Sequence, residues 1–319
     1  MRRISRDMPC FMRRPFSLAL ALLASSALVA QPVAAKDEAH IIKPSSAWVV
    51  DYKEESCRLM RQFGRGDDVV VAIFNHYAPG PYFQLTLAGR PVARNFGKTS
   101  GRVSLRFGPA EQAQQVEFLS GETGGLVAMI MPRAMTVAAP EAEVPEEDEA
   151  AQESEARARP VPIVSPERMA AVRTLTVDRH MLKPVTLELG NMGKAFGALD
   201  TCIDDLLKKW AIDPVHYKTL SRYARALESP SEWLTTFDYP DKMLRERQGA
   251  LVQFRLIVGA DGIPRSCLIQ ESTYPEAFDD AVCGTVMKRA RFAPALDGEG
   301  KAMDSVWQRS VRFRMRRPG

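Results

Sequence analysis

Three patterns in this chain predict an α+β protein. Short runs rich in β-branched and aromatic residues, separated by Gly, Pro and Asn, occupy residues 48–131 and are typical of a mostly-β domain. An acidic, proline-rich stretch follows and is expected to be a disordered insertion. Near the C-terminus, two alternating runs, a helical stripe and a last alternating run predict a β-β-α-β domain.

The first 35 residues have the pattern of a secretory signal peptide. Arg13 and Arg14 precede an apolar run over residues 16–30, and the small residues that follow favour cleavage after Ala35. An uncleaved inner-membrane anchor through residues 16–35 is the alternative, but a spanning helix needs about 20 apolar residues. The sequence therefore predicts export to the periplasm.

The N-terminal domain is expected in two parts, residues 36–137 and residues 167–230, on either side of the acidic linker 138–166. Expected strands of the first part are 48–52, 68–75, 82–87, 103–107, 115–119 and 126–131. The second part is expected to hold strands 173–177 and 184–189, a closing helix 191–210, and a helical stretch 213–228.

Charge argues against a nucleic-acid partner. The first 35 residues hold five arginines and one aspartate, so the rest has 43 − 5 = 38 basic and 39 − 1 = 38 acidic residues. A neutral chain lacks the excess of cations that phosphate backbones require. The arginine-rich C-terminus leaves contact with a membrane surface as a possible partner interaction, with a solvated strand face as the alternative.

Four cysteines remain after the signal peptide, and an even number in an oxidising compartment predicts disulfides. Cys267 is expected on a strand whose face packs on the helix that carries Cys283, so these two are paired. Elimination then pairs Cys57 with Cys202, which makes the acidic linker an insertion in one domain. Metal binding and redox activity are alternatives, but the spacings lack zinc-site and Cys-x-x-Cys patterns.

The C-terminal domain is expected over residues 235–319. Strands are predicted at 251–258 and 263–269, a helix at 275–289, and a third strand at 304–315. Phe278, Val282 and Val286 recur every four residues and form the helical stripe that packs on the sheet.

Short motifs in this domain resemble the C-terminal domain of the TonB family of energy transducers. They are Tyr239-Pro240 at the entrance, Gly249 before the first strand, Asp261-Gly262 in the hairpin, and Phe292 and Pro294 after the helix. The resemblance covers nearly all of the domain and rests on the order and spacing of these motifs.

The resemblance implies a TonB-dependent outer-membrane receptor, or another envelope protein, as the partner. In the family, a short segment of the receptor adds as a strand to the outermost strand, here 304–315. The side chains expected to face that partner are Gln308, Ser310, Arg312 and Arg314. Energised members dock with ExbB and ExbD through a histidine-bearing anchor, and the apolar run here has no histidine, which argues against that coupling.

The sequence shows no catalytic constellation, phosphate loop or cofactor motif, so a non-enzyme without cofactor is predicted. Energy transduction to outer-membrane receptors is one expected function. A periplasmic scaffold or ligand-binding protein that keeps the fold without energy coupling is the alternative. An exported enzyme with an unrecognised site is a third hypothesis.

Overall fold

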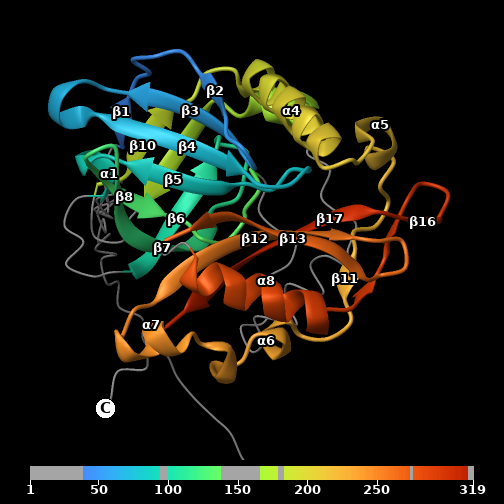
Figure 1. The fold of residues 1–319 in the computed structure, drawn as a ribbon. Coiled ribbons are helices and arrows are strands. Elements are labelled where there is room, and N and C mark those ends of the chain that lie inside the picture. Colours follow the sequence, from blue (N-terminus) through green and yellow to red (C-terminus); the bar gives the residue numbers. More distant parts are fainter. Residues whose placement is uncertain (1–38, 94–99, 138–165, 179–182, 274–275, 315–319) are drawn as a thin grey trace, which may run out of the picture. The chain divides into compact units, whose positions relative to one another are not determined.

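A computed structural model describes residues 39–93, 100–137, 166–178, 183–273 and 276–314. The described residues belong to one compact unit with mixed strand and helix content, which confirms the α+β class. The predicted signal peptide and nearly all of the acidic linker lie outside the described residues (Figure 1).

The N-terminal part is built on one ten-stranded sheet with the order β1-β10-β9-β6-β7-β8-β5-β4-β3-β2. Its strands are β1 (His40–Ile42), β2 (Val49–Tyr52), β3 (Cys57–Phe63), β4 (Val70–His76), β5 (Gln84–Ala88), β6 (Ser100–Phe107), β7 (Gln114–Thr123), β8 (Leu126–Ile130), β9 (Thr174–Asp178) and β10 (Val185–Glu188). All neighbours are antiparallel except β1 and β10. Backbone bonds from Gly64 to Lys43 (2.8 Å) and from Ser45 to Gln62 (2.9 Å) join the chain after β1 to β3.

Strands before and after the acidic linker lie in the same sheet. β9 pairs with β6, and β10 pairs with both β9 and β1, although the linker separates β8 from β9 in the sequence. A disulfide between Cys57 of β3 and Cys202 also joins the two parts, as predicted. The linker is therefore an insertion between two strands of one sheet.

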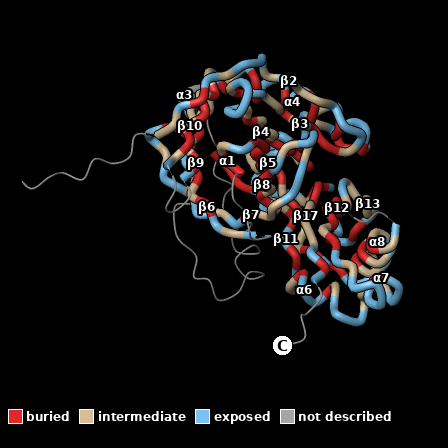
Figure 2. Tube along the Cα trace, turned by 90° about the vertical axis from the view of Figure 1, so that its left-hand side faces the viewer, coloured by how far each residue is buried: buried red, intermediate tan, exposed pale blue. Residues whose placement is uncertain are grey.

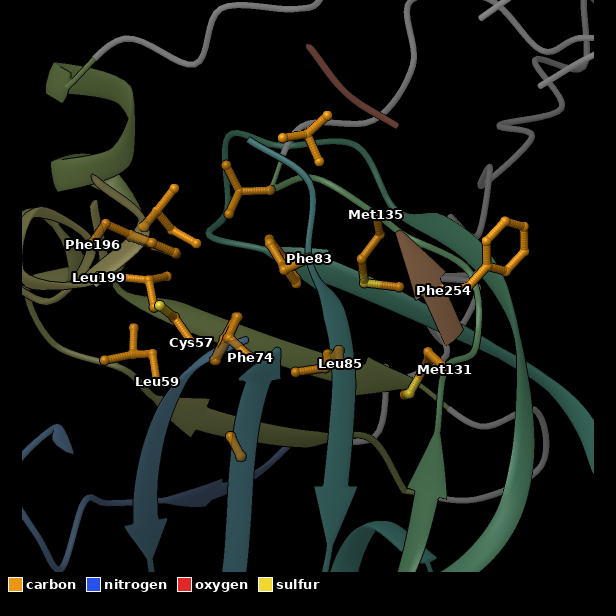
Figure 3. Close-up of a cluster of buried hydrophobic side chains, with 14 of the residues drawn as sticks. Cys57, Leu59, Phe74, Phe83, Leu85, Met131, Met135, Phe196, Leu199 and Phe254 are labelled. Carbon is orange, nitrogen blue, oxygen red and sulfur yellow. The ribbon is translucent and has the colours of Figure 1, made fainter. Parts of the chain in front are cut away.

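Helix α4 (Met192–Lys209) packs on this sheet through one apolar face. The Asn191 side chain accepts a hydrogen bond from the Gly193 amide at 2.9 Å, which caps the first turn. Phe196 and Leu199 then point toward Cys57, Leu59 and Phe74 in the buried cluster (Figure 3). The predicted closing helix is confirmed within one residue at each end.

Two strands of the ten-stranded sheet and several two-residue strands were missed, and one helical stretch was wrong. The sequence reading contained no strand at β1 or β3, although Cys57, Leu59 and Phe63 of β3 are fully buried. The stretch 213–228 was expected to be helical, but it holds only α5 (Pro214–Tyr217) followed by irregular chain and β11 (Arg225–Ala226). That chain pairs instead with residues 291–296, which satisfies its backbone groups outside a helix.

The C-terminal part has a three-stranded antiparallel sheet in the order β13-β12-β17, with one long helix on it. Its main elements are β12 (Ala250–Val258), β13 (Pro264–Ser272), α8 (Ala277–Arg289) and β17 (Ser305–Phe313). Phe278, Val282 and Val286 of α8 are fully buried, as the stripe predicted, and α8 lies over the sheet (Figure 1). Cys267 of β13 is bonded to Cys283 of α8, which agrees with the predicted pair.

Shorter elements connect these parts. They are η1 (Gly66–Asp68), α1 (Arg90–Ala93), α3 (Pro166–Ala171), α6 (Pro230–Trp233), η2 (Thr236–Asp238), α7 (Asp241–Arg245), β14 (Phe292–Ala293), β15 (Ala295–Leu296) and β16 (Ala302–Met303). Buried residues run along β3, β4, β5 and β12, whereas α7 is mostly exposed (Figure 2).

Candidate partner-binding site

The entrance motif of the C-terminal part fixes the start of its sheet. The Tyr239 ring packs edge-on against Phe278 and Phe313, with ring centroids 5.5 Å apart in each pair. Pro240 stands at the N-cap of α7. Gly249 lets the chain pass the end of β17, because a Cβ there would lie 2.7 Å from the Phe313 carbonyl oxygen.

The β12–β13 hairpin contacts the chain after α8 at Gly262. Its φ of +78° favours glycine, and a Cβ there would lie 2.0 Å from the Phe292 carbonyl oxygen. The Phe292 amide donates to the Gly262 carbonyl at 3.0 Å. Asp261 accepts from the Ile263 amide at 3.0 Å, and this bond is the main cause that lowers its pKa. The Pro294 carbonyl accepts from Arg222 at 3.3 Å, so these motif residues hold the domain together.

β17 is an end strand of the three-stranded sheet, and among the described strands it pairs only with β12. Trp307 and Phe313 are buried on the α8 side, as expected. The Phe313 ring centroid lies 4.6 Å from that of Phe278, and the Trp307 centroid lies 5.2 Å from that of Phe292. Aromatic packing therefore fixes β17 at one end of the three-stranded sheet.

The other face of the sheet contacts the ten-stranded sheet through buried polar side chains. Gln84 of β5 donates to the Gln253 side-chain oxygen at 2.8 Å, to Ser310 Oγ at 3.0 Å and to the Pro132 carbonyl at 2.8 Å. Ser310 also donates to Gln253. This face is therefore covered by the protein's own N-terminal part at its centre.

A buried ion pair forms a second contact between the two parts. Arg255 of β12 lies 3.2 Å from a carboxylate oxygen of Glu55, and their side chains are only 6% and 14% exposed. Trp210 donates to Glu55 at 2.8 Å, and its ring stacks 3.9 Å from the Arg255 guanidinium carbon. Lys209 lies 2.7 Å from the other oxygen of Glu55. Burial lowers the pKa of Arg255, so Glu55 compensates a charge that water does not solvate.

A third contact joins β13 to the end of β4. The buried Tyr77 hydroxyl donates to Glu271, and burial together with that carboxylate raises the pKa of Tyr77. Gln270 donates to the carbonyls of Glu55 (2.8 Å) and Tyr77 (2.7 Å). Burial also lowers the pKa of His76 to about 3, so its imidazole is neutral at physiological pH.

The four predicted partner-reading residues lie along the face of β17 that meets the N-terminal part. Ser310 contacts Gln84 and Gln253, whereas Arg312 and Arg314 are exposed at the end of the strand. Gln308 is half-buried. Sequence reasoning did not identify the contact made by Glu55, Trp210 and Arg255. The sequence feature that could have indicated it is the pair of polar residues Gln253 and Arg255 within the otherwise apolar strand β12.

Comparison with protein families identifies the C-terminal part. Residues 235–315 match the family model described as Gram-negative bacterial TonB protein C-terminal. These residues are a TonB C-terminal domain, as the motifs predicted, and the protein is TonB-like in this part of its chain. Comparison with curated proteins gave no match, and comparison with solved structures gave none either.

Within the described residues, no helix is both long and apolar enough to cross a membrane. In the same part of the chain, no three His, Cys, Asp or Glu side chains are placed to hold a metal ion.

Proposed function

We propose that this is an exported, non-enzymatic envelope protein whose TonB-like domain binds a partner strand along β17. The supporting observation is the place of β17 at one end of the three-stranded sheet, where among the described strands it pairs only with β12. Its N–H and C=O groups supply affinity by β-augmentation, and the partner is a TonB-dependent outer-membrane receptor or another envelope protein. Energy transduction to such receptors is the function that the family match favours.

A periplasmic scaffold or ligand-binding protein without energy coupling is the second candidate. A force-transmitting domain needs freedom to move with its partner, whereas this TonB-like domain contacts the N-terminal part through Glu55–Arg255, Tyr77–Glu271 and Gln84–Gln253. Ion pairs and hydrogen bonds at these positions favour a fixed arrangement of the two parts.

The two candidate functions predict different N-termini for the mature protein. Energy coupling requires a retained membrane anchor, whereas a scaffold is released after cleavage near Ala35. N-terminal sequencing of protein from washed inner membranes and from the osmotic-shock fraction separates them. An intact Arg13-Arg14 terminus in membranes supports the transducer, and a terminus near Lys36 in the shock fraction supports the scaffold.

Adjacent proline substitutions test the edge of β17. In an edge strand, consecutive backbone N–H groups point alternately toward the neighbouring strand and toward solvent. Of the variants Val311→Pro and Arg312→Pro, one therefore removes a bond to β12 and lowers stability, while the other removes an outward donor. The variant that loses the outward donor should retain the stability of the fold and lose binding of receptor-segment peptides.

Amide hydrogen exchange of the purified protein locates the bound peptide. Protection confined to residues 305–313 supports strand addition at β17. Protection confined to the β12–β13 hairpin or to α8 would overturn the proposal.

A further inference from the structure

The segment that enters the TonB-like domain presents a phenylalanine to solvent. Phe237 lies in η2 and is 96% exposed, the largest value among the exposed large apolar residues that the structure describes. The chain on either side of it is packed in the core, because Trp233 is 1% exposed and the Tyr239 ring centroid lies 5.5 Å from that of Phe313. The exposed ring therefore belongs to a segment that is held at both of its ends.

Hydrogen bonds fix the turn that carries Phe237. The Thr235 hydroxyl accepts from the Phe237 amide at 3.3 Å, and the Asp238 carboxylate accepts from the Thr235 amide at 2.8 Å. Arg289 of α8 donates to both oxygens of Asp238, at 2.8 and 3.0 Å, and such a paired contact holds the carboxylate in one orientation. A side chain on a turn that is already ordered loses less conformational entropy on binding, so Phe237 is suited to be an anchor.

Basic residues lie on α7 and directly after it. Lys242, Arg245 and Arg247 are exposed, and within the described part of the chain they form no ion pair. Leu244, between them in the sequence, is 46% exposed. α7 lies well away from α4 and α5 (Figure 1). This segment therefore combines apolar side chains with cations that have no counter-charge of their own.

The end of β17 adds positive charge at the same place. Ala250 pairs with Phe313, so the chain before β12 and the chain after β17 leave the sheet at the same end. Arg314 comes next and is exposed. The sequence that follows it to the C-terminus contains Arg316 and Arg317 and no acidic residue.

Together these side chains form a surface of mixed apolar and basic character, here called the entrance surface. It consists of Phe237, Leu244, Lys242, Arg245, Arg247 and Arg314. Two exposed acidic residues, Asp241 and Glu246, lie in the same stretch, so the net charge is 4 − 2 = +2. Apolar rings beside cations suit the surface of an anionic bilayer, where the ring enters the headgroup region and the cations meet the headgroup charges.

We propose that the entrance surface binds an anionic phospholipid bilayer, with the Phe237 ring in the headgroup region and the four basic side chains on the lipid phosphates. The core of a protein interface is depleted of charged residues, whereas charged residues accompany this ring, so a lipid surface fits better than a protein pocket. The inference does not depend on strand addition at β17, and either proposal can fail alone.

Sedimentation with lipid vesicles tests the role of the ring. The protein consists of residues 36–319, which include the whole compact unit, because the apolar run at 16–30 would itself bind lipid. We expect it to bind phosphatidylglycerol vesicles more tightly than phosphatidylcholine vesicles. F237A should bind the anionic vesicles about tenfold more weakly, since burial of a phenylalanine ring supplies at least that factor. V215A, which shortens a 76% exposed side chain on α5, should bind like the unmodified protein.

A second pair of variants tests the charges. Each basic residue near an anionic surface contributes about fivefold in affinity. We expect R245Q/R247Q to bind phosphatidylglycerol vesicles roughly 25-fold more weakly and phosphatidylcholine vesicles unchanged. R65Q/R106Q removes the same charge from exposed positions on the N-terminal part and should leave both affinities unchanged.

The variant F237W reports whether the ring enters the bilayer. The four tryptophans of the unmodified protein are buried or half-buried, so brominated lipids should quench them little. We expect the indole introduced by F237W to be quenched when anionic vesicles bind. Absence of binding to phosphatidylglycerol vesicles, equal binding by F237A or R245Q/R247Q and the unmodified protein, or binding without quenching in F237W would each overturn the proposal.

Discussion

The Glu55–Arg255 pair gives the sharpest test of how the two parts of the protein are joined. The substitution Glu55→Gln keeps the size of the side chain and an oxygen that can accept from Trp210, but it leaves Arg255 without its counter-charge. Breaking a buried pair costs about 3–5 kcal/mol, and these side chains are 6% and 14% exposed. Because the Glu55 side chain is 14% exposed, we expect a loss in the free energy of unfolding at the lower end of this range, about 3 kcal/mol. At about 2–4 °C per kcal/mol this lowers Tm by about 6–12 °C.

The assay is thermal and urea unfolding followed by tryptophan fluorescence, since Trp210 stacks on Arg255. Glu54→Gln is the matched control, because the Glu54 side chain is 88% exposed and lies 3.9 Å from Lys209. Its expected effect is below about 0.5 kcal/mol. The double variant E55Q/R255M removes both charges and should recover much of the loss. Equal stability of E55Q and E54Q, or a double variant no more stable than E55Q, would refute the reasoning.

Three further predictions concern the stability of the fold. Replacing both cysteines of the Cys57–Cys202 bond, which joins residues 145 positions apart, should lower the free energy of unfolding by about 4–5 kcal/mol in the chain-entropy model. Replacing Cys267 and Cys283, which are 16 positions apart, should lower it by about 3 kcal/mol. Urea unfolding without reductant checks this, and a larger loss for the second pair would contradict it. Gly124→Ala, at a position with positive φ and no atom within 4 Å of the added Cβ, should lower the free energy of unfolding by about 1 kcal/mol. Gly262→Ala should lower it by more than about 2 kcal/mol, because its Cβ would also meet the Phe292 carbonyl oxygen. Equal urea midpoints for the two would show that the contact at Phe292 is unimportant. The hydrogen bond from Arg289 lowers the pKa of Asp238 to about 2. The ionised Asp238 therefore stabilises the fold fully at pH values above its unfolded pKa of about 3.9, and this stabilisation is lost as the pH falls from there through about 2. Unfolding from pH 5 to pH 2 should show that loss in the unmodified protein and a flatter profile in Asp238→Asn, and parallel profiles would exclude this role.

Local patterns were sufficient for much of the fold. The stripe of Phe278, Val282 and Val286 predicted α8, because a helix buries residues at four-residue spacing whatever its partner is. Alternation predicted β12 and β17 for the corresponding reason in strands. The motif residues Tyr239 and Gly262 indicated the TonB-like domain, since their roles depend on short-range turns and contacts that recur wherever that fold occurs.

Long-range contacts decided the rest. The chain after α5 is not helical because its backbone bonds to residues 291–296, which are more than sixty positions away. Gln253 and Arg255 have the polar character of a solvent-facing strand side, yet they are 4% and 6% exposed because the N-terminal part covers them. The partners of a buried polar side chain, such as Glu55 for Arg255, depend on which distant surfaces meet. By itself the sequence determined the main strands and the long helix of the TonB-like domain, because their apolar periodicity is local. The tertiary structure decided that the N-terminal part covers the Gln253 face of β12, because that depends on which distant surfaces meet.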